Sequence, residues 1–373
     1  MHKRKEIVSR FFDKGHLLTP EALDFLAESK DYEKILDASI LVDKAIIEKD
    51  DFAAFETKND SVRIIKNLLE KPSELTPDIF NSFLISKFEK MKALFMERTD
   101  KSFLSLDKID NQRQEVYVIG MVRDVSREDG KMVVEIEDRT RSLKAVFTEP
   151  VPRTLPEEDD VVCIGGIGAK EVIFGKEIIY PDVPLREPSK GIGRICAISD
   201  LHLNEAPADR LVKFFDWLGK QDIKYLFIAG DTADYQRLAA MVKEHIPDKT
   251  VFIIPGNMDD ANYPGLPMKP DGGIICLSNP SMVEINGIKV LLIHRFDQSF
   301  LKKRYLGRSS VILKEDYLVL DVIPDIVIYG HTHEPSVSNY KSITIANPGS
   351  LLAEFRPVVI NLETREYQQL AFD

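Results

Sequence analysis

The chain reads Ile195-Cys196-Ala197-Ile198-Ser199-Asp200-Leu201-His202 at the start of its C-terminal half, an apolar run that passes directly into an acid and a histidine. A short, continuous apolar run of this kind is typical of a strand buried on both faces. Similar runs follow at 225–229, 251–254, 290–293, 326–329 and 343–345. Helical patterns over 207–218 and near 236–245 alternate with the first of these runs, so the sequence predicts a layered α/β domain.

Polar side chains follow the ends of five of these apolar runs. They are Asp200, His202, Asp231, Asn257, His294, His331 and His333. Functional groups of α/β domains gather outside the strand ends, and four of the chain's seven histidines fall in this set, so chance is a poor explanation. Oxygen and imidazole ligands in this mixture suit divalent Mn, Fe or Zn. The pattern therefore predicts two metal ions about 4 Å apart, an arrangement that attacks phosphate esters.

The spacing within the set suggests individual roles. Gly230 allows a tight bend, so the carboxylate of Asp231 can bridge two ions. His331 and His333, two residues apart, can each serve a different ion. Asp234 has two interpretations, because it can orient a metal ligand from behind or cap the following helix.

Residues 114–180 change to a period of two, which is typical of half-buried strands. Turn residues at 128–130 and 138–140 indicate hairpins, and five short strands fit a small barrel of the oligonucleotide-binding (OB) type. Arg123, Arg127 and Lys144 could line a groove that follows a nucleic-acid strand. Acidic residues interleave with them, so a solvated surface is the alternative.

The chain ahead of the barrel shows helical patterns over 1–50 and 61–98. Thr76-Pro77-Asp78 is a helix-start signal, and the apolar stripe that follows predicts either core packing or a docking surface for a partner. Prolines and glycines over 181–193 indicate a linker. The predicted division is a helical region at 1–110, the barrel at 111–185, a linker at 186–193 and the α/β domain at 194–373.

Composition narrows the setting. The 373 residues include no apolar run long enough to span a membrane, so a cytoplasmic protein with no membrane partner is expected. Three cysteines in apolar runs indicate small buried side chains and not a disulfide framework. A net charge of −11 disfavours an autonomous nucleic-acid binder but suits a subunit that receives nucleic acid from a partner.

The five blocks resemble those of the calcineurin-like metallophosphoesterases. The order of helical region, small barrel, Pro181-Asp182-Val183-Pro184 and phosphoesterase blocks resembles the small-subunit family of archaeal DNA polymerase D. This resemblance implies an αββα sandwich and a heterodimer with the large catalytic polymerase subunit. It also implies proofreading 3′–5′ exonuclease action on a DNA 3′ end, with two divalent ions, Mn foremost, bound by the seven side chains named above.

Two residues depart from the pattern of that family. Met258 stands where the superfamily motif Gly-Asn-His-Asp/Glu places its general-acid histidine, and Arg295 follows His294 where the family commonly has glycine. A thioether has no proton to donate, and loss of a general acid costs about 10²–10⁴ in rate. Asp259 is a possible substitute donor, and Arg295 a possible DNA contact. We therefore expect metal binding with weakened hydrolysis; the alternatives are a non-catalytic assembly subunit and a free-standing phosphodiesterase.

Overall fold

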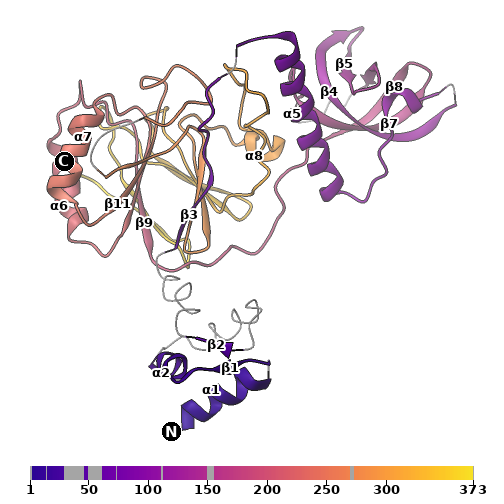
Figure 1. The fold of residues 1–373 in the computed structure, drawn as a ribbon. Helices are drawn as coiled ribbons and strands as arrows, with labels where there is room; N and C mark the ends of the chain where they lie inside the picture. Colours follow the sequence, from indigo (N-terminus) through magenta and orange to yellow (C-terminus); the bar gives the residue numbers. More distant parts are fainter. Residues whose placement is uncertain are drawn as a thin grey trace. The chain divides into compact units, whose positions relative to one another are not determined.

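A computed structural model describes residues 2–13, 15–28, 46–48, 61–72, 74–110, 112–148, 155–268 and 273–372. The chain forms two compact units. The first comprises residues 1–63 with 284–287, and the second comprises 64–283 with 288–373. Figure 1 traces both units along the sequence.

In its described residues the first unit has the helices α1 (His2–Asp13) and α2 (Pro20–Glu28). Strands β1 (Leu17–Leu18) and β2 (Ile46–Ile47) pair in parallel, and their apolar side chains join a small core. That core is made of Ile7, Phe11, Ala22, Leu26 and Ile47. The two helices confirm part of the helical prediction for 1–50, whereas β1 and β2 were not expected. Residues 1, 14, 29–45, 49 and 50 of that prediction lie outside the described part.

Two six-stranded sheets form the α/β part of the second unit. The first has the order β12-β11-β10-β9-β18-β19. Its strands are β9 (Arg194–Ile198), β10 (Tyr225–Ala229), β11 (Thr250–Ile254), β12 (Ile275–Cys276), β18 (Val358–Asn361) and β19 (Tyr367–Gln369). The second sheet has the order β16-β17-β15-β14-β13-β3. Its strands are β3 (Val62–Lys66), β13 (Ser281–Ile285), β14 (Ile288–Leu292), β15 (Ile326–Ile328), β16 (Ser336–Tyr340) and β17 (Ile343–Asn347).

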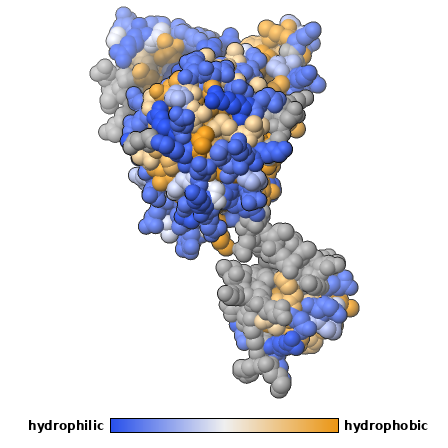
Figure 2. All heavy atoms as spheres, turned by 90° about the vertical axis from the view of Figure 1, so that its left-hand side faces the viewer, coloured by the Kyte–Doolittle hydropathy of each residue, from blue (hydrophilic) through white to orange (hydrophobic). Residues whose placement is uncertain are grey.

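Each sheet is covered on its outer face. Helices α6 (Asp209–Gly219) and α7 (Tyr235–His245) pack their apolar sides on β9, β10 and β11. Figure 2 views this side of the molecule, where hydrophilic residues are interspersed with apolar ones. Helix α5 (Pro77–Arg98) and α8 (Ser299–Lys303) pack on the second sheet. The predicted layered α/β phosphoesterase fold is confirmed.

The prediction of a helix from residue 61 is wrong. Val62–Lys66 forms β3, the edge strand beside β13, and the helix begins only at Pro77. Branched residues favour a strand there, and Pro72 would interrupt a helix. Thr76 caps α5 by accepting a hydrogen bond from the Ile79 N–H at 3.3 Å, as the start signal indicated.

The predicted OB-type barrel is confirmed as a closed barrel with the strand order β4-β5-β6-β8-β7. Its strands are β4 (Gln114–Glu128), β5 (Lys131–Glu137), β6 (Ser142–Phe147), β7 (Val161–Ala169) and β8 (Val172–Ile179). Asp129 and Gly130 have φ of 49° and 77°, the left-handed backbone of a two-residue hairpin turn. The short 3₁₀ helix η3 (Leu106–Lys108) precedes the barrel.

Helix α5 joins the barrel to the second sheet. Its residues Phe88, Met91, Leu94 and Phe95 share one buried cluster with outward-facing residues of β4 and β7 and with β14, β15 and β17. Most of the apolar stripe predicted for this helix is therefore core, although Phe80 at its start is exposed. None of the helices in the described ranges is long and apolar enough to cross a membrane.

Candidate dinuclear metal centre

The structure brings all seven predicted ligands together at the ends of β9, β10, β11, β14 and β15. Asp200, Asp231 and His294 are fully buried and form the base of the site. Asn257 and His331 are exposed at its mouth. A buried base with an open rim leaves these side chains accessible from solvent.

The first group of ligands consists of Asp200, His202 and His333. Nε2 of His202 lies 3.2 Å from Nε2 of His333. Oδ1 of Asp200 lies 3.4 Å from Nε2 of His333 and 4.0 Å from Nε2 of His202. The Asp200 carboxylate also accepts the His331 N–H, with 3.0 Å to Oδ2, which fixes its orientation.

The second group consists of Asp231, Asn257, His294 and His331. Nδ1 of His294 lies 2.8 Å from the carbonyl oxygen of Ala229, which accepts its proton. Nε2 of the same ring faces Oδ1 of Asn257 at 3.1 Å and Oδ2 of Asp231 at 3.2 Å. Nδ1 of His331 lies 2.9 Å from that Asn257 oxygen.

These separations fit divalent cations. Ligand atoms around an ion with bonds of about 2.1 Å lie roughly 3.0–3.4 Å apart, for octahedral or tetrahedral geometry. In each group, lone pairs of nitrogen and oxygen converge at such distances, and a cation would satisfy them together. Ligand atoms of Asp200, Asp231 and His294 also lie within 4.8 Å of one another, so the two groups adjoin. The bridging role of Asp231 that the sequence suggested stays a prediction.

Strained backbone surrounds the site. Asp200, His202 and Asp231 have φ of 52°, 43° and 49°, and His331 and His333 have φ of 71° and 58°. A left-handed conformation costs a non-glycine residue roughly 1–2 kcal/mol, and such residues cluster at functional sites. Five of the seven ligands adopt it, which turns side chains that leave a strand inward to a common point.

Three glycines give the ligands room. A Cβ on Gly256 would lie 2.1 Å from Oδ1 of Asp231, and one on Gly330 would lie 2.4 Å from Oδ2 of Asp200. A Cβ on Gly230 would lie 2.6 Å from Nδ1 of His294. Each glycine therefore allows a ligand to lie directly against the neighbouring loop.

The electrostatics of the base favour a positive charge. Burial lowers the pKa of His294, but the hydrogen bond and charge of Asp231 outweigh it, so the pKa is raised. Burial likewise opposes ionisation of Asp231, yet its contact with His294 lowers the pKa of Asp231. Burial raises the pKa of Asp200. Burial and the charges of His294 and Arg295 lower the pKa of His331, which favours the neutral ring that binds metals.

The model of the calcineurin-like phosphoesterase superfamily matches residues 194–365. These residues have the calcineurin-like phosphoesterase fold. Phosphoesterases of this superfamily use divalent metals, in agreement with the donor set described above.

Similarity to known proteins extends beyond this domain. A protein of Thermoplasma acidophilum named DNA polymerase II small subunit is 26% identical, with 92% of this chain and 85% of that protein covered. A Pyrococcus abyssi protein of the same name is also 26% identical, with 92% and 69% covered. A solved structure of an archaeal phosphodiesterase is 19% identical, covers 48% of this chain and 99% of its own, and gives a TM-score of 0.35. The resemblance to the archaeal polymerase small subunits is confirmed.

Met258 lies at the mouth of the phosphoesterase site. Its side chain is 66% exposed, and its backbone N–H donates to Oδ1 of Asp231 at 2.8 Å. The sulfur offers no proton. Asp259, the suggested substitute donor, has its carboxylate engaged by three backbone N–H groups and one hydroxyl, so both oxygens act as acceptors.

The remaining predicted residues lie away from the ligands or at their edge. Asp234 accepts from the Arg237 N–H at 2.9 Å as the N-cap of α7, which is the capping alternative. Arg123 pairs with Glu137 at 2.9 Å and Lys144 with Glu128 at 3.6 Å, as in a solvated surface. The other two candidate DNA contacts, Arg127 and Arg295, are exposed.

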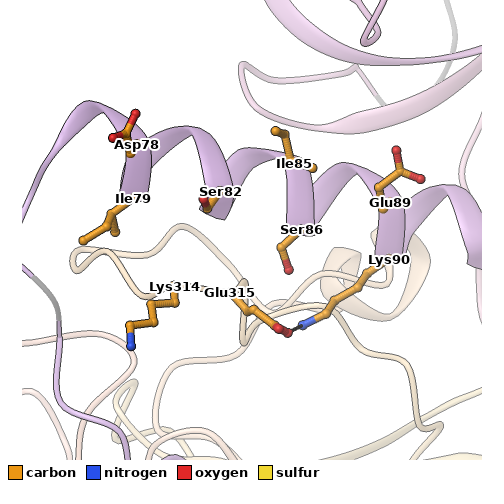
Figure 3. A pocket seen from close by; sticks show the side chains of 9 residues that line it. All are labelled: Asp78, Ile79, Ser82, Ile85, Ser86, Glu89, Lys90, Lys314 and Glu315. Carbon is orange, nitrogen blue, oxygen red and sulfur yellow. Dashed lines mark hydrogen bonds and ion pairs between the residues drawn. The ribbon is translucent and has the colours of Figure 1, made fainter.

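A separate hollow of about 680 Å³ lies along α5 (Figure 3). Its lining residues are Asp78, Ile79, Ser82, Ile85, Ser86, Glu89, Lys90, Lys314 and Glu315. Lys90 and Glu315 form an ion pair at 3.1 Å on its wall. The lining includes no predicted ligand, so this hollow is not part of the metal centre.

Proposed function

We propose that the chain is the small subunit of a family D DNA polymerase and carries a 3′–5′ exonuclease site that Met258 has weakened. One observation carries the activity: seven nitrogen and oxygen donors from five strand ends converge at metal-ligand spacing. The similarity to archaeal polymerase small subunits over nine-tenths of the chain supports a DNA substrate.

The ligand set indicates how the reaction would run. When bound, a pair of divalent ions neutralises charge on the phosphate oxygens and acidifies a water nucleophile, and we expect Mn²⁺ to serve best. Asp200, His202 and His333 would hold the first ion, and Asp231, Asn257, His294 and His331 the second. Ala229 keeps the proton of His294 on Nδ1, which directs the Nε2 lone pair into the site. Because Met258 cannot protonate the leaving alkoxide, we expect solvent to do so slowly.

The proposal includes a partner. The relatives are named small subunits of a polymerase, so we expect this chain to form a heterodimer with a large catalytic subunit. A partner that carries DNA also accounts for a nuclease-type site on a chain with a net charge of −11. Exposed Arg295, next to ligand His294, is the residue that we propose contacts the DNA 3′ end.

A primer-degradation assay tests the activity. Purified protein, alone and with its large subunit, is incubated with Mn²⁺ and a primer that ends in a 3′ mismatch. We expect slow release of nucleotides from the 3′ end, abolished by chelation and by Asp231→Ala. Degradation no faster than in the Asp231→Ala protein would refute the exonuclease proposal.

A second candidate function is a non-catalytic assembly subunit. The exposed thioether of Met258 at the general-acid position favours it. In that case the metal ions would only stabilise the domain, and the heterodimer would form although the chain hydrolyses no DNA. The turnover of a Met258→His variant separates the two functions, because a wild type that already matches this variant is not a non-catalytic subunit.

A further inference from the structure

Asp259 lies behind the metal centre and connects two ligand-bearing loops. Its Oδ1 accepts the Ala233 N–H at 2.9 Å, and its Oδ2 accepts the Gly256 N–H at 2.9 Å and the Tyr235 hydroxyl at 3.0 Å. Both oxygens also lie 3.2 Å from the Thr232 nitrogen. The carboxylate therefore ties the loop after β10 to the loop after β11.

The loop after β10 is shaped to receive an anion. Asp231 and Ala233 have left-handed φ of 49° and 67° on either side of Thr232. Alternation of this kind turns successive N–H groups to one side and forms a concavity that binds negative charge. The Asp259 carboxylate occupies it, and charge-assisted hydrogen bonds of this type offset the strain of the two residues.

The loops after β10 and β11 each accept a hydrogen bond from the other. Asp231, directly before Thr232, accepts the Met258 N–H at 2.8 Å through Oδ1. Gly256, directly before Asn257, is held by Asp259 and leaves no room for a Cβ beside Asp231. Two metal ligands from different strands are thus fixed relative to each other by the carboxylate of a residue outside the predicted ligand set.

We propose that Asp259 is a positioning residue for the second metal ion. Its carboxylate sets the separation of the ligands Asp231 and Asn257. This inference rests on the metal site of the proposed function, and it assigns Asp259 no role in proton transfer. Its carboxylate accepts hydrogen bonds from four donors, three backbone N–H groups and one hydroxyl, so it acts as an acceptor. Asp259 does not hold the other three ligands of the first ion, Asp200, His202 and His333, which come from the ends of β9 and β15, so this tie affects the first ion only through Asp231.

Calorimetric titration of the metal-free full chain with Mn²⁺ tests the proposal. Wild type should bind two ions. Asp259→Asn keeps the size of the side chain but replaces one acceptor oxygen by a donor. Loss of an outer partner of a metal ligand typically costs 10–100-fold in affinity, so the second-ion affinity should fall by that factor. The first-ion affinity should fall much less, because three of its ligands keep their positions.

Asp260→Asn is the matched control. It makes the same change in charge one residue away, but the donors to Asp260 among the described residues lie in its own loop. They are the backbone N–H of Asn262 at 2.9 Å, its side-chain amide at 3.0 Å and the backbone N–H of Leu266 at 3.3 Å. We expect wild-type affinity for both ions. A purely structural role of Asp259 would lower the unfolding temperature and leave both affinities of the folded protein intact, so the selective loss identifies positioning.

Wild-type affinity for the second ion in Asp259→Asn would overturn the inference alone, whereas failure of the wild type to bind two ions would overturn the proposed function with it. If Asp259→Asn does not fold, Tyr235→Phe decides. It removes one of the four donors to the carboxylate. A loss of about two- to three-fold in second-ion affinity is expected, which is one quarter, on a logarithmic scale, of the 10–100-fold loss expected for Asp259→Asn. An unchanged affinity in that variant would overturn the inference.

Discussion

Gly256→Ala should disable the second metal position by simple exclusion of volume. The added Cβ would lie 2.1 Å from Oδ1, 2.4 Å from the backbone nitrogen and 2.6 Å from Cγ of Asp231. Cβ contacts below 3.0 Å are essentially unknown, so Asp231 and Gly256 must separate by at least 0.9 Å. Both backbone and carboxylate are in the way, so rotation of the side chain cannot relieve the clash.

A shift of that size is large for a metal ligand, whose bonds tolerate about 0.2 Å. Misplacement by about 1 Å at a reacting centre costs about 10²-fold, and we expect at least that loss in Mn²⁺ affinity at the second position. The assay is titration of the metal-free protein, with circular dichroism to confirm the fold. Gly265→Ala is the matched control in the same region of chain, since its nearest neighbour is Pro255 Cγ at 3.2 Å. Two ions bound by Gly256→Ala with wild-type affinity would refute the packing argument.

Three further predictions concern activity, metal removal and pH. Met258→His should raise the Mn²⁺-dependent exonuclease rate by about 10²-fold or more, because a general acid is restored; equal turnover of the two proteins would show that the donor is not limiting. Chelation should lower the free energy of unfolding by about 2.7 kcal/mol per ion initially present at 100 times its Kd, and scanning calorimetry should show a smaller change in Asp231→Ala, which lacks a ligand of the second ion. Burial lowers the pKa of Lys87, whose Nζ lies 3.9 Å from the Tyr305 ring, below its usual 10.5. Between the folded pKa and 10.5, the unfolded chain therefore binds one more proton at Lys87 than the folded chain does. In urea unfolding, the free energy of unfolding of the wild type should rise relative to that of Lys87→Met by about 1.4 kcal/mol per pH unit in this range. A constant difference across that range would contradict it.

The positions of the strands and the convergence of the seven polar side chains could be predicted because the strands and the residues that follow them are local properties of the sequence. The run 195–198 is apolar enough to be a buried strand, and the polar residues that follow it lie within a few positions. Because strand ends meet at one edge of a sheet, Asp200, Asp231 and His294 are predicted to lie close together without any knowledge of distances. The barrel followed in the same way from its period of two and from the Asp129-Gly130 turn.

Other features depend on contacts between distant residues, which a single sequence does not state. Val62–Lys66 is a strand only because β13, more than 200 residues later, offers it an edge. The sequence suggests Asp259 as a substitute proton donor, whereas in the structure its carboxylate accepts hydrogen bonds from residues that follow β10. Lys87, a polar residue in the helical pattern, is buried beneath Tyr305 on the core face of α5. In each case the partner is far away in the chain.

The account depends most on the claim that two metal ions occupy the site. Anomalous diffraction from crystals of the Mn²⁺-loaded protein tests it directly. We predict two peaks about 4 Å apart, one within bonding distance of His202 and His333 and the other within bonding distance of Asn257, His294 and His331. A single peak, or none, in fully loaded crystals would contradict the account.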